Sequence, residues 1–264
     1  MMKKYLVIGN PIEHSLSPKL HNFWLKKYKV NAVYEKKKIN ENELTNIISE
    51  IKKEKINGIN VTVPFKKAII PLLEKLSPEA EKTQSVNTIF LKNNSVVGHN
   101  TDIDGFEFAI KELNIDIKNK KIFILGAGGV VPSLIFAFNR MMASKIIISN
   151  RTKQNAENLK KLFNNITIVS WGELPEFDVI INATSIGLNK NDKINLDFSK
   201  VGKNKLFYDV IYNSKETNFL KIGKQLGNKS ENGKLMFIYQ AVLAFKLWHG
   251  INPDVNKEII ELLD

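Results

Sequence analysis

The chain of 264 residues contains no cysteine, which excludes disulfide bonds, thiolate metal sites and a cysteine nucleophile. Arginine is nearly absent as well: Arg140 and Arg151 are its only two occurrences, and the other 37 of the 39 basic residues are lysine. No apolar run approaches the roughly 20 residues that a membrane-spanning helix needs. The apolar run near the N-terminus is also too short for a signal peptide. We therefore expect a cytoplasmic protein without a membrane partner.

Lysine, in contrast, is abundant, and the formal net charge of +12 raises the question of nucleic-acid binding. The basic runs alternate with apolar residues, as the exposed faces of helices and strands do. Arginine, which reads guanine and phosphate, is scarce. We expect no nucleic-acid partner and only a weak attraction for anionic small molecules. The four histidines are scattered without metal-ligand spacing, so no metal site is predicted.

Short strand-like runs alternate with helical segments along the chain, which predicts an α/β fold with mainly parallel sheets. Residues 58–63 are an expected strand, and Ser17 is the expected N-cap of an early helix. Residues 87–91 and 95–97 are expected to pair as a hairpin. A length of 264 residues suits one large domain or two of ordinary size. We place a domain boundary near residue 100.

The second half of the chain contains a predicted phosphate-binding turn. Residues 121–133 read KIFILGAGGVVPS, in which an apolar strand runs into Gly126, Ala127, Gly128 and Gly129 and then into a helical segment. Glycines permit a tight turn and a close backbone approach to a pyrophosphate, which the first N–H groups of the next helix would bind. This strand–turn–helix context predicts a Rossmann-type dinucleotide-binding domain.

The end of the following strand indicates which dinucleotide is bound. An enzyme for NAD would place an acidic residue there to hold the ribose 2′-hydroxyl. This chain has Asn150, Arg151, Thr152 and Lys153 instead. Arginine pairs with a 2′-phosphate that an acid would repel. NADP is therefore the expected cofactor.

Two further apolar strands of the second half, in FDVIINATSIGL and LFYDVIYN, end in polar residues that include Thr184 and Tyr212. The second strand is expected to end at Tyr212. Because the carboxyl ends of parallel strands form the binding edge of an open α/β sheet, these side chains are expected beside the nicotinamide.

Polar side chains also follow the predicted strands of the first half. Hydroxyls, amides, one cation and one carboxylate meet at one expected sheet edge: Ser15, Ser17, Thr62, Lys66, Asn87, Asn100, Thr101 and Asp102. This set suits a small polyhydroxylated molecule that carries a carboxylate. Most lysines of so basic a chain lie on the surface, and Lys66 is singled out only because it directly follows the strand in NVTVPFK.

The motifs GNPIEHSLSP, NVTVPFK, SVNT, NTD, GAGG, NRT, NATSIGL and LMFIYQAVLAFKLWHG resemble, in this order and over essentially the whole chain, those of the shikimate dehydrogenase family. The resemblance implies an oxidoreductase that reversibly reduces 3-dehydroshikimate to shikimate with NADPH, a step towards chorismate and the aromatic amino acids. It implies a substrate domain over residues 1–101, an NADP-binding Rossmann domain over 102–236 and C-terminal helices over 237–264 that return to the first domain. A monomer or a homodimer is expected.

The resemblance also implies roles for single residues. Lys66 and Asp102 would be the catalytic pair, in which the ammonium stabilises the alkoxide formed at the substrate carbonyl and supplies its proton. Ser15 and Ser17 would hold the substrate carboxylate. The substrate hydroxyls would be bound by Thr62, Asn87, Asp102, Tyr212 and Gln240. Thr184, Val210 and Gly233 would join the glycine turn and the NRTK segment in binding the cofactor.

The chain departs from the family pattern at three places. Asn155 stands where a second arginine is frequent, an arginine soon after the glycine turn is missing, and Lys234 and Leu235 interrupt the usual GLGM. The nearest alternative is a paralogue that also accepts quinate or has a broader cofactor range. A non-catalytic NADP-binding regulator on the same fold is a second alternative, against which the intact Lys66 and Asp102 argue.

Overall fold

The structure is a computed structural model that describes residues 2–189 and 191–264. The predicted ranges 1–101 and 102–236 each contain one residue outside the described part, at positions 1 and 190. The chain forms two compact units. Phe106–Phe237 is one unit, and the residues up to Gly105 form the other together with Ile238–Asp264. No helix in the described part of the chain is long and apolar enough to cross a membrane.

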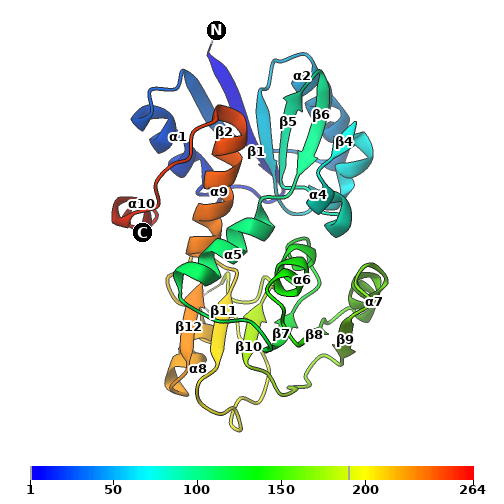
Figure 1. Ribbon diagram of the computed structural model, residues 1–264, viewed down its shortest axis with the longest axis vertical. Helices are drawn as coiled ribbons and strands as arrows, with labels where there is room; N and C mark the ends of the chain where they lie inside the picture. The colour runs from blue at the N-terminus through cyan, green and yellow to red at the C-terminus, as the bar shows by residue number, and fades with distance from the viewer. Residues whose placement is uncertain (1, 190) are drawn as a thin grey trace. The chain divides into compact units, whose positions relative to one another are not determined.

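The first unit is built on a six-stranded mixed sheet with the strand order β2-β1-β3-β5-β6-β4 (Figure 1). Its strands are β1 (Lys3–Gly9), β2 (Ala32–Lys38), β3 (Gly58–Val61), β4 (Lys75–Leu76), β5 (Thr88–Lys92) and β6 (Ser95–His99). β1 pairs in parallel with β2 and with β3. β5 runs antiparallel to both β3 and β6, so the predicted hairpin is confirmed.

Helices cover this sheet through apolar stripes. Leu44, Ile47 and Ile51 recur at helical spacing and are buried in one core cluster with Ile59 of β3 and Ile89 of β5. Such a stripe forms because residues three and four apart share one helix face. Apart from two helices that continue into the other unit, the helices of this unit are α1 (Ser17–Lys27), η1 (Glu41–Glu43), α2 (Leu44–Lys52), α3 (Phe65–Ala68), η2 (Ile70–Leu72), α4 (Pro78–Thr83) and α10 (Lys257–Leu262).

Two helices, α5 (Asp102–Glu112) and α9 (Lys234–His249), continue from one unit into the other. The C-terminal part of α9 packs on the first sheet. Trp248 Nε1 donates to the carbonyl oxygen of Ile89 at 3.3 Å, and its ring lies 4.9 Å from that of Tyr5. A side chain at Gly58 would collide with Trp248, so the glycine is what lets the helix approach β3. The C-terminal helices therefore return to the first unit, as predicted.

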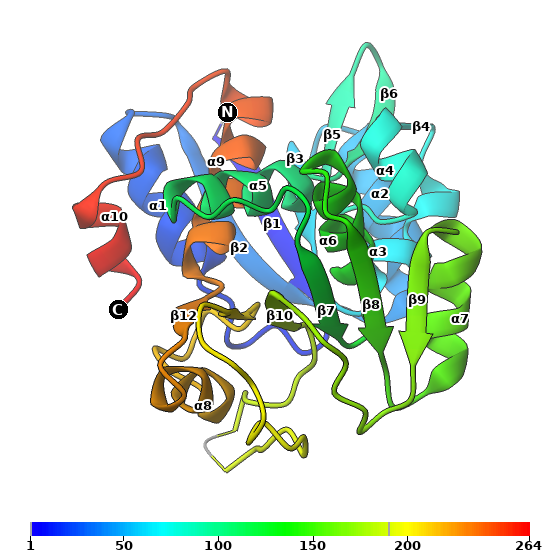
Figure 2. The same cartoon turned by 60° about the horizontal axis from the view of Figure 1, so that its bottom comes forward.

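The second unit contains a fully parallel six-stranded sheet with the order β12-β11-β10-β7-β8-β9. Counted from β7, this is the order 3-2-1-4-5-6 of a Rossmann fold, and Figure 2 shows β7, β8 and β9 side by side. The strands are β7 (Lys121–Leu125), β8 (Lys145–Ser149), β9 (Ile166–Val169), β10 (Val179–Asn182), β11 (Leu206–Asp209) and β12 (Lys229–Asn232), and the helices are α6 (Val131–Arg140), α7 (Lys153–Leu162) and α8 (Asn218–Gln225). The predicted dinucleotide-binding architecture is confirmed.

Two strands end earlier than predicted, and in both cases a local hydrogen bond turns the chain. β3 ends at Val61 rather than at residue 63, because the Phe65 N–H donates to the carbonyl oxygen of Thr62 at 2.9 Å. β11 ends at Asp209 rather than at residue 212, because the Ile211 N–H donates to Asp209 Oδ1 at 3.0 Å. Functional candidates after these strands therefore lie on turns and not on the ladders.

Candidate active site

Lys66 lies on the short helix α3, directly after the turn that ends β3. Its Nζ is 2.5 Å from Oδ2 of Asp102, the first residue of α5. Lys66 is 9% exposed and Asp102 is 5% exposed. An ammonium and a carboxylate removed from water stabilise each other, whereas either alone would be strongly unfavourable. The interpretation of Lys66 as one more solvated surface lysine is therefore wrong.

Two asparagines hold Asp102 in position. Asn87 Nδ2 donates to Asp102 Oδ1 at 2.8 Å, so that each carboxylate oxygen has a donor. The Asp102 N–H donates to Asn100 Oδ1 at 3.0 Å, and the Thr101 N–H donates to Asn87 Oδ1 at 2.8 Å. The structure thus brings Lys66, Asn87 and Asp102 together through the NTD segment at the start of α5.

A deeper layer of this network escaped the interpretation of the sequence. Asn60 of β3 donates through Nδ2 to the carbonyl oxygen of Asn87 and to Thr88 Oγ1, both at 3.0 Å. Its Oδ1 accepts a hydrogen bond from the hydroxyl of Tyr34 at 2.7 Å. The available signal was an amide within GINV, a strand whose four residues are all buried, since buried polar residues are rare unless they have partners.

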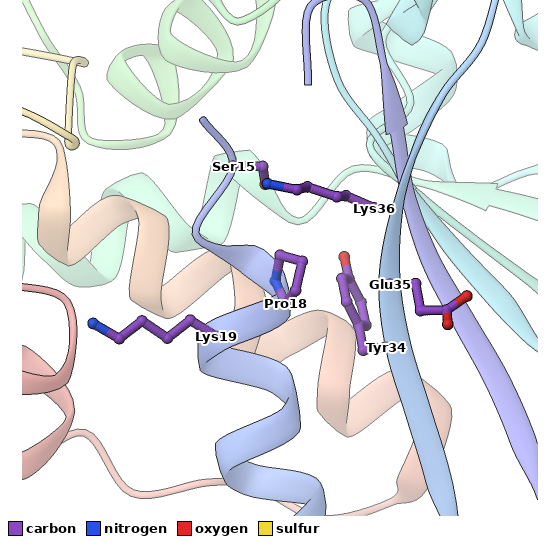
Figure 3. A pocket seen from close by; sticks show the side chains of 6 residues that line it. All are labelled: Ser15, Pro18, Lys19, Tyr34, Glu35 and Lys36. Carbon is purple, nitrogen blue, oxygen red and sulfur yellow. The ribbon is translucent and has the colours of Figure 1, made fainter. Parts of the chain in front are cut away.

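Ser15 and Ser17 lie at the start of α1. The predicted N-cap role of Ser17 is wrong, because Ser17 is the first helical residue and Ser15 Oγ accepts the Ser17 N–H at 3.3 Å. Figure 3 shows a pocket at this place, with Ser15 and the end of Lys36 pointing towards each other. The pocket is lined by Ser15, Pro18, Lys19, Tyr34, Glu35 and Lys36. A hydroxyl and an ammonium on the same side suit an anionic group.

Thr62 and Gln240 are the remaining predicted substrate residues of the first unit. Thr62 is half-buried, and its N–H donates to the carbonyl oxygen of Ile8 at 2.9 Å, so it lies beside the end of β1. Gln240 lies on α9 where this helix meets α5. A Cβ at Gly105 would come within 2.7 Å of the Gln240 backbone nitrogen. The glycine therefore allows Gln240 to approach α5 one turn after Asp102.

The glycine turn of the second unit follows β7. Gly126 has a φ of +112°, which favours glycine, and a Cβ there would lie 2.7 Å from the carbonyl oxygen of Ala183. Gly128 and Gly129 are exposed, and nothing lies within 4 Å of a Cβ placed at Gly128. α6 then begins with Pro132 in its first turn, as predicted. The open start of this helix can accept a pyrophosphate.

The segment after β8 has the character of an anion site. Arg151, Thr152 and Lys153 are all exposed. Thr152 occupies the N-cap position of α7, but its side chain makes no capping hydrogen bond. Asn150 Nδ2 donates to the carbonyl oxygen of Thr152 at 2.8 Å and shapes the turn. Two cations and a hydroxyl thus surround the start of a ten-residue helix, where the helix dipole also favours an anion.

Thr184, Val210 and Gly233 follow the neighbouring strands β10, β11 and β12. Thr184 Oγ1 donates to Asn182 Oδ1 at 2.7 Å, and the Val210 N–H donates to the carbonyl oxygen of Asn182 at 3.0 Å. The Gly233 N–H donates to the carbonyl oxygen of Ile211 at 3.1 Å. Asn182 therefore links Thr184 to Val210, and Ile211, which follows Val210, accepts the hydrogen bond of Gly233. The three predicted cofactor residues thus lie together at one edge of the second sheet.

Tyr212 belongs to the second unit and lies in the loop after β11. Its ring stacks on that of Phe237 with centroids 4.1 Å apart and an interplanar angle of 16°. The tyrosine is half-buried, so one part of it packs while another part stays accessible. This placement supports a binding role better than a position in the sheet would, because loop residues at strand ends face ligands.

Three segments of the chain match known families. Residues 7–89 match the shikimate dehydrogenase substrate binding domain, residues 107–209 match shikimate / quinate 5-dehydrogenase, and residues 235–257 match the shikimate 5′-dehydrogenase C-terminal domain. A shikimate dehydrogenase (NADP(+)) of Pelagibacter ubique strain HTCC1062 is 57% identical over 264 residues, which are 100% of each chain.

Solved structures agree with these matches. The shikimate dehydrogenase of Aquifex aeolicus has a TM-score of 0.90 and 37% identity, and the match covers 99% of this chain and 97% of that one. The shikimate 5-dehydrogenase of Thermus thermophilus, solved in complex with NADP(H) and shikimate, has a TM-score of 0.90 at 31% identity. That match covers 99% of this chain and 98% of the other.

Proposed function

The chain belongs to the shikimate dehydrogenase family, and from this membership we propose that it catalyses the reversible, NADPH-dependent reduction of 3-dehydroshikimate to shikimate. The observation that supports the proposal most is the buried Lys66–Asp102 pair at the carboxyl edge of the first sheet. The reaction would be a cytoplasmic step in the formation of chorismate and the aromatic amino acids, carried out by a monomer or a homodimer.

NADPH, when bound, supplies the hydride that reduces the substrate carbonyl. Negative charge develops on the carbonyl oxygen, which the Lys66 ammonium stabilises and then protonates. Asp102 holds the ammonium through its Oδ2. In shikimate oxidation the neutral Lys66 amine accepts the same proton. The burial of the pair strengthens these interactions, since charges interact more strongly in a medium of low dielectric constant.

Substrate binding is assigned to a set of polar residues. Ser15 and Ser17 hold the carboxylate, and the nearby Lys36 adds positive charge to the pocket of Ser15. The substrate hydroxyls are bound by Thr62, Asn87, Asp102, Tyr212 and Gln240. A ring with several hydroxyls needs such a set, because each buried hydroxyl left without a partner would weaken binding.

The residues of the second unit fit NADP along its length. The turn of Gly126, Ala127, Gly128 and Gly129 binds the pyrophosphate at the start of α6. Asn150, Arg151, Thr152 and Lys153 bind the adenosine ribose and its 2′-phosphate, and the Thr152 hydroxyl, which makes no capping bond, is available for this purpose. Thr184, Val210 and Gly233 bind the nicotinamide end.

In domain terms, residues 1–101 form the substrate domain, residues 102–236 form the NADP-binding domain, and residues 237–264 pack back on the first domain. A paralogue of broader cofactor range is not favoured, because the acid that would hold the ribose 2′-hydroxyl of NAD is absent after β8. The relative with 57% identity also carries the name shikimate dehydrogenase (NADP(+)).

A spectrophotometric assay of NADP⁺ reduction with shikimate tests the proposal, with quinate and NAD⁺ as matched alternatives. We expect the highest kcat/KM for the shikimate and NADP⁺ pair. Absence of turnover with shikimate and either cofactor would refute the proposal. A comparable kcat/KM for quinate would replace it with the broader paralogue.

A further inference from the structure

Asp209, the last residue of β11, has a fully buried carboxylate at the carboxyl edge of the second sheet. Its Oδ1 accepts the Ile211 N–H at 3.0 Å, and its Oδ2 accepts the Thr217 hydroxyl at 2.7 Å. Asn182 Nδ2 donates to both oxygens at 3.1 Å. Its hydrogen-bond donors in the described part of the chain are thus all neutral.

Such a carboxylate is unfavourable to bury, because neutral donors replace only part of its hydration. Burial raises the pKa of Asp209, and hydrogen bonds from Thr217, Ile211 and Asn182 oppose that rise. An apolar residue at the end of β11 would avoid this cost. The carboxylate therefore has a use that offsets the cost, and its donors indicate what the use is.

Two of the donors, Asn182 and Ile211, also form hydrogen bonds with residues of the proposed nicotinamide site. Asn182 Oδ1 accepts both the N–H and the hydroxyl of Thr184, at 3.1 and 2.7 Å. Ile211 presents its N–H to the carboxylate and its carbonyl oxygen to the Gly233 N–H, at 3.1 Å. Gly233 in turn has no room for a side chain, because a Cβ would collide with the carbonyl group of Val210.

The third donor, Thr217, binds the carboxylate from the C-terminal end of the loop that follows β11. Thr217 is the N-cap of α8, and its oxygen accepts the Leu220 N–H at 3.4 Å. The loop 210–217, which carries Val210 and Tyr212, is therefore tied to one carboxylate near both of its ends.

We propose that Asp209 is a positioning residue that holds the segments 183–187 and 210–217 in the conformation that binds the nicotinamide end of the cofactor. The inference rests on the proposed function, because it concerns the cofactor of that reaction. Asp209 need not touch the cofactor. It acts through Asn182, Ile211 and Thr217, and it makes no contribution to binding of the adenosine end.

The adenosine end is held separately. Asn150–Lys153 follow β8, which is two strands away from β10 in the sheet order. That turn has its own hydrogen bond, from Asn150 Nδ2 to the carbonyl oxygen of Thr152. Loss of the Asp209 contacts should therefore weaken binding of the nicotinamide end and leave binding of the adenosine end unchanged. General damage to the fold would weaken the binding of both ends.

The test is Asp209→Asn in the full chain, with calorimetric titration of NADP⁺ and of adenosine 2′,5′-bisphosphate, which carries only the adenosine end. An amide presents a donor where Asn182 Nδ2 already donates, so one of these contacts becomes repulsive. We expect NADP⁺ to bind about tenfold more weakly, the size of one lost hydrogen bond to a charged group. The affinity for the bisphosphate should stay within about twofold, and kcat with shikimate should fall.

Asp178→Asn is the matched control, because Asp178 precedes β10 at the opposite edge of the same sheet. It accepts the Lys121 N–H at 2.9 Å and Lys205 Nζ at 3.2 Å. This variant should bind both ligands like the wild type. Equal weakening of both ligands by Asp209→Asn, or no weakening of NADP⁺, would overturn the inference. A wild-type chain without shikimate turnover would refute the proposed function instead.

A second pair of variants covers the case in which Asp209→Asn does not fold. Thr217→Val removes one donor to the carboxylate, and Thr217→Ser keeps it. We expect Thr217→Val to weaken NADP⁺ binding and lower kcat without changing the affinity for adenosine 2′,5′-bisphosphate, and Thr217→Ser to restore both. Identical behaviour of the two variants would contradict the role of the hydroxyl contact.

Discussion

The two units each bury an aspartate near the carboxyl edge of a sheet, and the two aspartates have different partners. Asp102 accepts a hydrogen bond from the ammonium of Lys66 at 2.5 Å. Asp209 is 0% exposed and accepts only from neutral groups in the described part of the chain. A carboxylate beside an ammonium can take part in proton transfer, because its partner can lose and regain a proton. A carboxylate among amides and a hydroxyl can only hold segments in place.

The largest expected effect is that of Lys66→Ala, which removes the ammonium partner of Asp102. We expect kcat for shikimate oxidation to fall by about 10²–10⁴-fold, the usual contribution of a general acid–base group, while the Kd for shikimate changes little. Lys67→Ala is the control, because Lys67 is the next residue of α3 and is exposed. Steady-state kinetics and shikimate titration measure the two quantities. A kcat close to that of the wild type in Lys66→Ala would remove Lys66 from the mechanism.

Arg151→Asp should have the next largest effect and should act on the cofactor alone. Replacing a cation with an anion beside a 2′-phosphate removes a charge-assisted contact of about 1.5–3 kcal/mol and adds repulsion. We expect kcat/KM for NADP⁺ to fall by one to two orders of magnitude, and that for NAD⁺ to change much less. Arg140→Gln is the control, since Arg140 is the last residue of α6 and pairs with Glu107 at 3.1 Å. Equal losses for both cofactors would contradict the assignment.

Gly105→Ala sharpens the comparison on the side of the first unit. The new Cβ would lie 2.7 Å from the Gln240 backbone nitrogen, so α9 must shift. Overpacking of this kind lowers the free energy of unfolding by about 1–3 kcal/mol, which urea titration measures. Gly202→Ala is the control, because nothing lies within 4 Å of a Cβ at that position. Equal stability of the two variants would show that α5 and α9 can accommodate an additional methyl group between them.

The smallest expected effect is a difference in pH dependence between the units. Burial lowers the pKa of His21 to about 3, below the value of about 6.5 expected in the unfolded chain. Between these values the unfolded state binds the additional proton. The stability is therefore fully present above about pH 6.5 and is lost as the pH falls, by at most about 1.4 kcal/mol per pH unit for this group.

Phe in place of His21 removes this titration and keeps an aromatic ring on Tyr34, on which His21 stacks at 4.2 Å. We expect the His21→Phe variant to lose less stability than the wild type between pH 7 and pH 5, by denaturant titration. A residual slope should remain, because burial also lowers the pKa of His249 to about 4. An unchanged slope in His21→Phe would contradict the prediction.

The stability contributed by Asp209 depends on pH in the opposite direction. Burial raises its folded pKa above the unfolded value, so the folded state binds the additional proton there. The stability from this group is greatest at low pH and declines as the pH rises through the folded pKa. The two units therefore respond to acid in opposite senses through these groups.

Local patterns predicted those parts of the molecule that depend on neighbouring residues. The glycine turn at Gly126 and the absence of an acid after β8 could be interpreted from the sequence, because the steric and charge requirements behind them act within a few residues. The alternation of strand-like and helical segments predicted mainly parallel sheets, and the parallel pairing of the second sheet confirmed it. Strand ends were less predictable, because β3 and β11 end where single hydrogen bonds turn the chain.

Contacts between distant segments were beyond prediction from local patterns. The hydroxyl of Tyr34 reaches Asn60 across 26 residues, and Asn182 reaches Asp209 across 27. A polar residue in an apolar strand signals that a partner exists, but not which one, because many sequence positions carry suitable donors.

The order of amino acids alone was enough to identify two α/β units, the family, the cofactor and the lysine that follows NVTVPF. The family was identified from the resemblance of its motifs, whereas the two units and the cofactor were predicted from periodicity, from glycine sterics and from charge at short range. Tertiary packing decided that Lys66 is buried against Asp102 and that the Asp209 carboxylate accepts hydrogen bonds from Asn182, Ile211 and Thr217. The reason is physical: burial and hydrogen-bond geometry depend on which distant segments exclude water together, and that arrangement exists only once the sheets have formed.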